Sequence, residues 1–249
     1  MNPFNSTVVW LTWRQLFAKK RLWLAIVFSL VPLVFTIFFR FSSDDSDGVR
    51  LKFFSTLCRE IIIGTIIPLA AAVFGTTAFG GEIDDGTLVY LLVKPLPRWK
   101  VVLSKYVVAV AATIGVLVPS MALPWYVLSG PQLTFEVLEG FVLGGAMGSA
   151  IYCAIFLLLG LASRRALVAS LLYVIAFEGV LSRNLVGVKS LSVREFAVAA
   201  SQAAGQGAIK LMGYVVPMTT VWTMSAIFLV GALAFTLHKL NTYEMAERI

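Results

Sequence analysis

The chain has 249 residues, of which 59% are hydrophobic and 13% charged, and its formal net charge is +7. A soluble domain carries roughly 25% charged residues, so this chain holds more apolar surface than a water-soluble core buries, and we expect lipid to be its solvent. The positive charge fits basic residues kept on the cytoplasmic side of a membrane better than it fits nucleic-acid binding, and we expect no nucleic-acid partner.

The first predicted element is an amphipathic helix over residues 5–20. Its apolar side carries Trp10, Trp13 and Phe17, and Arg14 is among the basic residues nearby. Tryptophan next to basic residues is typical of a helix that lies in the headgroup region of a bilayer. The alternative is that these residues extend the first membrane span into the cytoplasm.

Six apolar runs follow, and a helix needs about 20 apolar residues to cross the hydrocarbon. We expect the spans at residues 22–40, 61–81, 106–128, 140–163, 166–182 and 217–237. A polar outer loop is expected over residues 42–52. The capping-box pattern that begins at Ser192, with Gly205 as a stop, predicts a short outer helix over residues 193–204, before the last span. The fold is therefore expected to be all-α, a polytopic membrane protein with one transmembrane domain over residues 1–249.

The distribution of basic residues sets the expected orientation. With the N-terminus inside, most of the 20 Lys and Arg residues fall on the cytoplasmic side, as the positive-inside rule requires. An even number of spans then places both termini in the cytoplasm of a protein of the plasma or inner membrane.

Residues 82–105, between the second and third predicted spans, form the most strongly patterned polar stretch, EIDDGTLVYLLVKPLPRWKVVLSK. An aspartate near its start can cap a helix, and the leucines that follow at i, i+3 and i+4 share one face. Pro95 ends this short helix, and Pro97 suits the first turn of the next. An apolar face in water needs a cover, which is either a partner protein or the chain's own inner surface.

This stretch resembles the signature loop of type-2 ABC transporter permeases, the six-span membrane subunits of ATP-driven exporters. In that family the first cytoplasmic loop reads E-x-x-x-G-T-L-x-x-L-L-x-x-P-x-x-R, with a lysine seven residues later. Each position is matched here, by Glu82, Gly86, Thr87, Leu88, Leu91, Leu92, Pro95, Arg98 and Lys105. The resemblance also covers the helix before the first span, the span count and the outer helix.

The resemblance implies that the loop forms a coupling helix that docks on a separate ATPase subunit. The leucines 88, 91 and 92 would be the docking face, Asp85 would belong to its polar start, and Gly86 and Thr87 would set the entry to the helix. Glu82 would fasten the second span to the loop through Arg98, Lys105 or the N-terminal helix.

The same resemblance implies the partners and the division of labour. Two ATP-binding subunits would pair with two permeases, either two copies of this chain or this chain and a relative. ATP and Mg would bind to the ATPase, with no cofactor in this chain. ATP hydrolysed there would drive a substrate, by export, through a cavity lined by spans two and five.

Two further sets of residues are singled out by spacing. Gly140, Gly144 and Gly148 recur every fourth residue in the fourth span, which lets another helix approach closely. A partner helix in the same chain is favoured over one in a second copy, and both stay open.

Charged residues near the outer ends of spans form the other set: Arg59, Glu60, Glu178 and Arg183. A charge within a span is costly and is a functional candidate. Near the span ends these residues can reach water or one another, so we interpret Glu178 as an ion-pair or hydrogen-bond residue, with an outer-gate role as the alternative.

The sequence contains no Gly-rich phosphate loop, no acidic residue in the middle of a span and no protease-type catalytic set. We therefore expect no enzyme activity, no ATP site and no metal site in this chain. Acid–base or metal chemistry at the acidic residues 82–85 is a minor alternative. The competing functions are an ion-coupled carrier or channel, and a membrane scaffold or assembly subunit.

Overall fold

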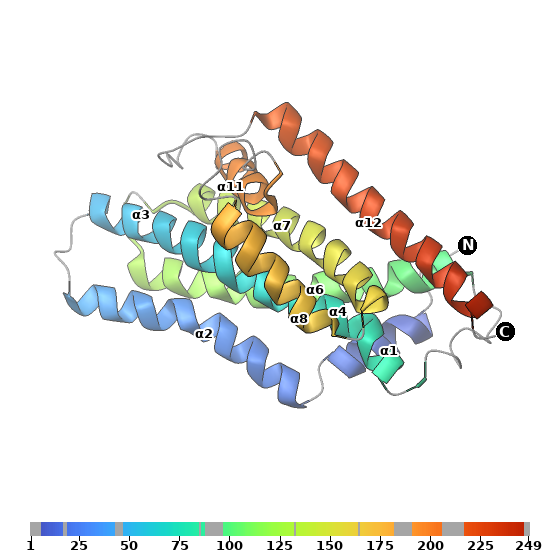
Figure 1. The fold of residues 1–249 in the computed structure, drawn as a ribbon. Helices are drawn as coiled ribbons and strands as arrows, with labels where there is room; N and C mark the ends of the chain where they lie inside the picture. The colour runs from blue at the N-terminus through green and yellow to red at the C-terminus, as the bar shows by residue number, and fades with distance from the viewer. Residues whose placement is uncertain are drawn as a thin grey trace.

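The computed structural model describes residues 6–16, 19–42, 47–84, 86–87, 97–131, 133–163, 165–181, 191–205 and 217–246. Throughout these ranges the regular structure is helical, without a strand (Figure 1). The helices are α1 (Ser6–Leu16), α2 (Lys19–Ser42), α3 (Asp47–Thr56), η1 (Leu57–Ile66), α4 (Ile67–Asp84), α6 (Arg98–Leu128), α7 (Phe135–Ala162), α8 (Ala166–Tyr173), η2 (Val174–Leu181), α11 (Val193–Ala204) and α12 (Met218–Ala246). The two elements η1 and η2 are π-helices.

Five helical stretches in the described ranges are long and apolar enough to cross a membrane. They are Trp23–Phe41, Gly48–Ile83, Arg98–Leu128, Phe135–Ala162 and Met218–Thr242. These stretches overlap five of the six predicted spans. The remaining predicted span, residues 166–182, corresponds to α8 and η2, whose apolar part Ala166–Val180 is shorter than the others.

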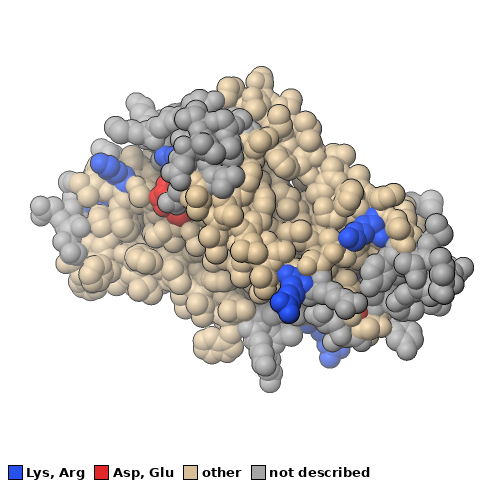
Figure 2. Space-filling model, in the orientation of Figure 1, with Lys and Arg blue, Asp and Glu red and all other residues tan. Residues whose placement is uncertain are grey.

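Helix α7 lies in the middle of the bundle and packs most extensively against α4 and α11, while α6 packs against α2, α4 and α7. The core between them is rich in large apolar and aromatic side chains, including Phe54, Ile62, Phe79, Phe141, Tyr152, Phe156 and Phe196. Helices α2 and α12 lie on the outside of the bundle (Figure 1) and expose large apolar side chains such as Phe38 and Trp222. The face drawn in Figure 2 is mostly uncharged, as expected of a surface in contact with lipid.

The predicted outer loop over residues 42–52 is wrong in its second half. Helix α3 begins at Asp47 and continues through η1 into α4, so that a single helical stretch of 36 residues runs from Gly48 to Ile83. The charged residues near its start suggested a loop, but Phe54 and Cys58 are fully buried and hold this part of the helix against the bundle. The stretch is about 54 Å long at 1.5 Å per residue, which is longer than the ~30 Å hydrocarbon core.

Helix α1 forms within the predicted range but ends at Leu16, and its buried side differs from the predicted apolar side. Thr12 and Leu16 are buried where α1 packs on α6 and α4, whereas Trp10 and Trp13 are exposed. The Arg14 guanidinium lies 5.5 Å from the centre of the Trp10 ring. The side of α1 that packs on the neighbouring helices therefore includes the polar Thr12, and the two tryptophans are left on the outside.

Helix α11 has the predicted bounds. The Ser192 side chain caps its N-terminus by accepting a hydrogen bond from the Glu195 backbone N–H, and Gly205 follows its last residue. Local signals, the capping box and the glycine stop, were enough to define this helix.

Candidate functional site: the joint between α4 and α6

The ends of the residue 82–105 segment are joined by a buried ion pair. Lys105, in the second turn of α6, donates to Glu82 Oε1 at 2.7 Å, and Glu82 lies in the last turn of α4. Lys105 is 0% exposed and Glu82 is 3% exposed. Of the three partners predicted for Glu82, the structure shows Lys105.

Further contacts stabilise the charge of the Lys105 ammonium in this buried position. It also donates to the Ala78 carbonyl of α4 and lies 4.9 Å from the centre of the Phe79 ring. Glu82 Oε2, by contrast, is buried without a hydrogen-bond partner in the described part of the chain. Because a buried charge that loses its partner is strongly destabilising, this pair fixes the spacing between α4 and α6.

The residues Gly86 and Thr87 end helix α4. Gly86 has φ +66°, and its N–H donates to the Ile83 carbonyl at 3.2 Å. The Thr87 N–H donates to the Glu82 carbonyl at 2.8 Å. These two bonds form a Schellman motif, in which a residue with left-handed backbone, usually glycine, closes the last turn. The Gly-Thr pair of the signature is therefore a helix stop, and its predicted part in the entry to a following helix concerns residues outside the described ranges.

Arg98 connects the start of α6 to α12. Its guanidinium Nη1 donates to the backbone carbonyl and the side-chain Oδ1 of Asn241, both at 3.2 Å. The first turn of α6 and the last part of α12 thus lie at the same end of the bundle as the last turn of α4 (Figure 1).

Several predicted site residues lie outside the described residues, and nothing is said of their structure. They are Asp85, Leu88, Leu91, Leu92 and Pro95 of the loop, Phe17 of the N-terminal segment, and Arg183.

At the opposite end of the bundle, α11 is held to η1 by a second ion pair, in which Arg194 is buried and Glu60 is partly exposed. Arg194 Nη2 lies 2.6 Å from Glu60 Oε1, and Arg59 lies 3.7 Å from the same oxygen. Gly64 leaves room for the guanidinium, since a Cβ there would lie 3.1 Å from Arg194 Nε. Sequence reasoning singled out Arg59 and Glu60 but missed Arg194, although its place in the capping box already put it at the start of α11.

Glu178 of η2 holds the N-terminus of α11. Its Oε1 accepts from the Val193 N–H at 3.0 Å, and its Oε2 accepts from the Ser192 hydroxyl at 2.5 Å. Glu178 is 2% exposed, and a carboxylate at a helix N-terminus meets free N–H groups and the positive end of the helix dipole. The hydroxyl of Tyr152 is close enough to interact electrostatically with this carboxylate, but it lacks hydrogen-bond geometry.

The glycines of the fourth span face α11 of the same chain. A Cβ at Gly144 would lie 2.0 Å from Ser201 Oγ and 2.3 Å from the Ala197 carbonyl, and one at Gly148 would lie 3.0 Å from the Ala197 Cβ. Gly140 is buried in α7. The small residues therefore serve contact within one subunit at Gly144 and Gly148.

The ion pairs described so far consist of single acid–base contacts rather than metal-ligand clusters. Within the described ranges, no group of three or more His, Cys, Asp or Glu residues could hold a metal ion.

Helices of membrane length around a buried core, joined at one end by a buried ion pair, define a multi-pass α-helical membrane protein. The family model described as ABC-2 family transporter protein matches residues 14–179, and the chain belongs to this family. Members of this family are membrane components of transporters, and membership implies association with an ABC ATP-binding subunit. A comparison with curated proteins found no match.

Proposed function

We propose that this chain is the permease subunit of an ATP-driven exporter, and that residues 82–105 dock on the separate ATPase subunit. The observation that carries the proposal is the joint between α4 and α6, by which we mean the helix stop at Gly86 and the buried pair of Glu82 and Lys105. The segment leaves α4 through the Schellman motif at Gly86 and is tied to α4 again at Lys105 by the buried Glu82 pair. A force applied to the segment therefore acts on both helices.

The joint explains how docking would move the membrane part. Lys105 contacts Glu82, Ala78 and the Phe79 ring, so the first turns of α6 are fixed to the last turns of α4. The contact between Arg98 and Asn241 extends the same rigid unit to α12. When the ATPase subunits close on ATP and Mg, α4, α6 and α12 move together at this end.

The proposal includes the assembly and the topology. Two ATPase subunits serve two permeases, which are two copies of this chain or this chain and a relative, and neither ATP nor another cofactor binds here. The stretch from α8 through η2 is the fifth crossing in chain order and brings the number of crossings to six. Both termini lie in the cytoplasm, and α11 lies outside. α4 and α8 line the path of the substrate.

The docking face is tested with the double variant Leu88→Asp with Leu92→Asp, co-expressed with a tagged ATPase subunit. Two carboxylates on an apolar contact surface oppose burial, so the ATPase is expected to be lost on purification and ATP-driven transport to stop. The matched control is Val93→Asp, which introduces the same group on the other side of the predicted helix and should leave the complex intact. Complex and transport that survive in the double variant would show that the docking assignment is wrong.

The same purification separates the competing functions. A permease copurifies with an ATP-binding subunit in a fixed ratio, whereas an ion-coupled carrier or channel transports without one. A scaffold would hold a partner through this loop but would show no transport in vesicles supplied with ATP.

A further inference from the structure

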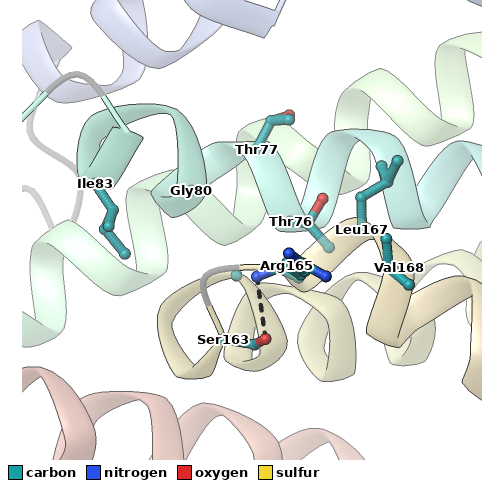
Figure 3. Close-up of a pocket in the computed structure, with 10 residues that line it drawn as sticks. Thr76, Thr77, Gly80, Ile83, Ser163, Arg165, Leu167 and Val168 are labelled. Carbon is teal, nitrogen blue, oxygen red and sulfur yellow. Dashed lines mark hydrogen bonds between the residues drawn. The ribbon is translucent and has the colours of Figure 1, made fainter.

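A cavity of about 170 Å³ lies where α4, α7 and α8 meet, at the end of the bundle that contains the joint (Figure 3). Thr76, Gly80 and Ile83 line it from α4, and Ser163 and Arg165 line it from the turn between α7 and α8. A single water needs only about 10–15 Å³ by the same measure, so the space accepts a group larger than water.

The turn between α7 and α8 presents hydrogen-bond donors to this cavity. Figure 3 shows the Arg165 side chain in the space between α4 and the turn. Arg165 is exposed, and within the described ranges its guanidinium has neither an ion pair nor a hydrogen bond. The Ser163 Oγ accepts from the Arg165 backbone N–H at 3.2 Å, which leaves the hydroxyl hydrogen to be donated.

The first turn of α8 begins directly after Arg165 and has backbone donors of its own. The Ala169 N–H makes the bond to the Arg165 carbonyl, at 3.0 Å. The N–H groups before it have no partner within the helix, as at any helix start. The Arg165 guanidinium and the Ser163 hydroxyl belong to residues that line the cavity and are donors of the kind that bind phosphate, and arginine matches two phosphate oxygens at once.

The other described side chains that line the cavity do not include a group that would repel an anion. The hydroxyls of Thr76 and Thr77 donate to carbonyls of their own helix, Ala72 and Val73. Its described lining residues include no carboxylate, and Glu82 on the same helix is occupied by Lys105. Among the described residues that line the cavity, the charge is therefore positive.

The rim of the cavity is apolar and faces the surroundings. Leu167 and Val168, which line it from α8, are exposed, at 42% and 52%. A ligand with its phosphate at Arg165 and an acyl chain over these residues would be matched at both ends. Basic pockets between membrane helices on the cytoplasmic side are places where lipid headgroups bind.

We propose that this cavity binds a phosphate group on Arg165 and Ser163, supplied by an anionic membrane lipid whose chain covers Leu167 and Val168. The proposal takes from the proposed function only the orientation that puts this end of the bundle in the cytoplasmic leaflet. It does not depend on the ATPase subunit.

The test measures the unfolding midpoint of the purified chain in neutral detergent, titrated with phosphatidylglycerol in one arm and with inorganic phosphate in the other. The wild-type midpoint should rise with phosphatidylglycerol and stay constant with inorganic phosphate at equal concentration. An equal rise in both arms also supports a phosphate site but assigns it to a soluble ligand. No rise in either arm overturns the proposal.

Three variants locate the effect. Arg165→Gln should raise the half-saturating lipid concentration by roughly tenfold or more, as expected for loss of a charge-assisted hydrogen bond, with the lipid-free midpoint unchanged. Gly80→Leu should have the same effect with every charge kept, because Gly80 lines the cavity and a Cβ there would meet only the Gly160 carbonyl, at 3.9 Å. Lys239→Gln on α12 removes the same charge away from the cavity and should bind lipid as the wild type does.

The outcome that contradicts the site is equally clear. If Arg165→Gln and Lys239→Gln lose the same amount of lipid binding, the lipid responds to net charge and the cavity is not its site. Because all arms omit the ATPase, failure here leaves the docking proposal standing, and failure of docking leaves this proposal standing.

Discussion

At the residue scale, Glu82 has two functions that depend on different atoms. Its carbonyl accepts the Thr87 N–H that closes α4, and its carboxylate pairs with Lys105 of α6. The end of one helix and the position of the next are thereby set by one residue. Glu82 and Lys105 are 23 residues apart in the sequence.

The ion pair can be tested by removing each partner and then both. Lys105→Met leaves the Glu82 carboxylate buried alone and should destabilise the protein by about 3–5 kcal/mol, whereas the double variant with Glu82→Gln should recover much of that loss. The measurement is a double-mutant cycle on the unfolding midpoint in detergent. Arg98→Gln, whose bonds to Asn241 are solvent-exposed, is the control and should cost less than Lys105→Met. Losses that simply add would mean that the two charges are not coupled.

The residues of this joint were predictable in kind, but not in their geometry. The spacing of the signature identified Glu82 and Lys105, yet it left three partners open, because sequence distance does not show which side chain faces which. Gly86 was interpreted as the entry to the next helix, since a glycine with positive φ suits either end of a turn. Only the bonds from Gly86 and Thr87 back to α4 show that it is a stop.

At the element scale, α11 is the most firmly held of the short helices. Arg194 binds it to η1, Glu178 of η2 holds its N-terminus, and Gly144 lets α7 approach it at backbone distance. Both polar contacts come from π-helices, which in other proteins are frequent at functional sites. Helix α11 therefore couples the second predicted span to the fifth.

The close contact predicts that Gly144 tolerates no side chain. In Gly144→Ala the new Cβ would meet Ser201 Oγ and the Ala197 carbonyl, which forces α11 away from α7 and should cost about 1–3 kcal/mol. The readout is the unfolding midpoint, together with the rate of proteolysis within α11. Gly115→Ala on α6 has nothing within 4 Å of the new Cβ and should be neutral or stabilising. Equal midpoints for the two variants would contradict the packing argument.

What could be predicted at this scale depended on whether the signal was local. Ser192 and Gly205 gave the bounds of α11, because caps act within a few residues. Asp47 and Lys52 suggested a loop where α3 is helical, because burial of Phe54 by distant residues decides that region. The π-helical hydrogen bonding of η1 and η2 has no comparable sequence signature and depends on packing.

At the scale of the whole molecule, hydrogen bonds and ion pairs between helices mark the two ends of the bundle. Arg98 with Asn241 and Glu82 with Lys105 mark one end, and Arg194 with Glu60 marks the other. α8 and η2, with eight residues each, connect the two ends, although they extend only about 24 Å at 1.5 Å per residue. That is less than the ~30 Å hydrocarbon core, so in the proposed six-span topology the bilayer or the chain must adapt where α8 and η2 cross.

The proposed topology predicts the accessibility of introduced thiols. Cys58 and Cys153 are fully buried, so the two native thiols are not expected to react with the labelling reagent. In intact cells, Ala203→Cys on α11 should react with a membrane-impermeant maleimide, whereas Thr242→Cys on α12 should react only after permeabilisation. Both positions are exposed in the bundle, so each is a control for the other. Labelling of Thr242→Cys in intact cells would place that end outside and contradict the proposed orientation.

The buried pair of Glu82 and Lys105 also has a consequence for the synthesis of the protein on the ribosome and its insertion into the membrane. Lys105 is made 23 residues after Glu82, which is about 1 to 5 s at about 5–20 residues per second. During this interval α4 carries an acidic group whose basic partner does not yet exist, and an acidic residue resists entry into lipid. We therefore expect the segment from α4 to α6 to enter the bilayer as one hairpin, after Lys105 has been made and has paired with Glu82.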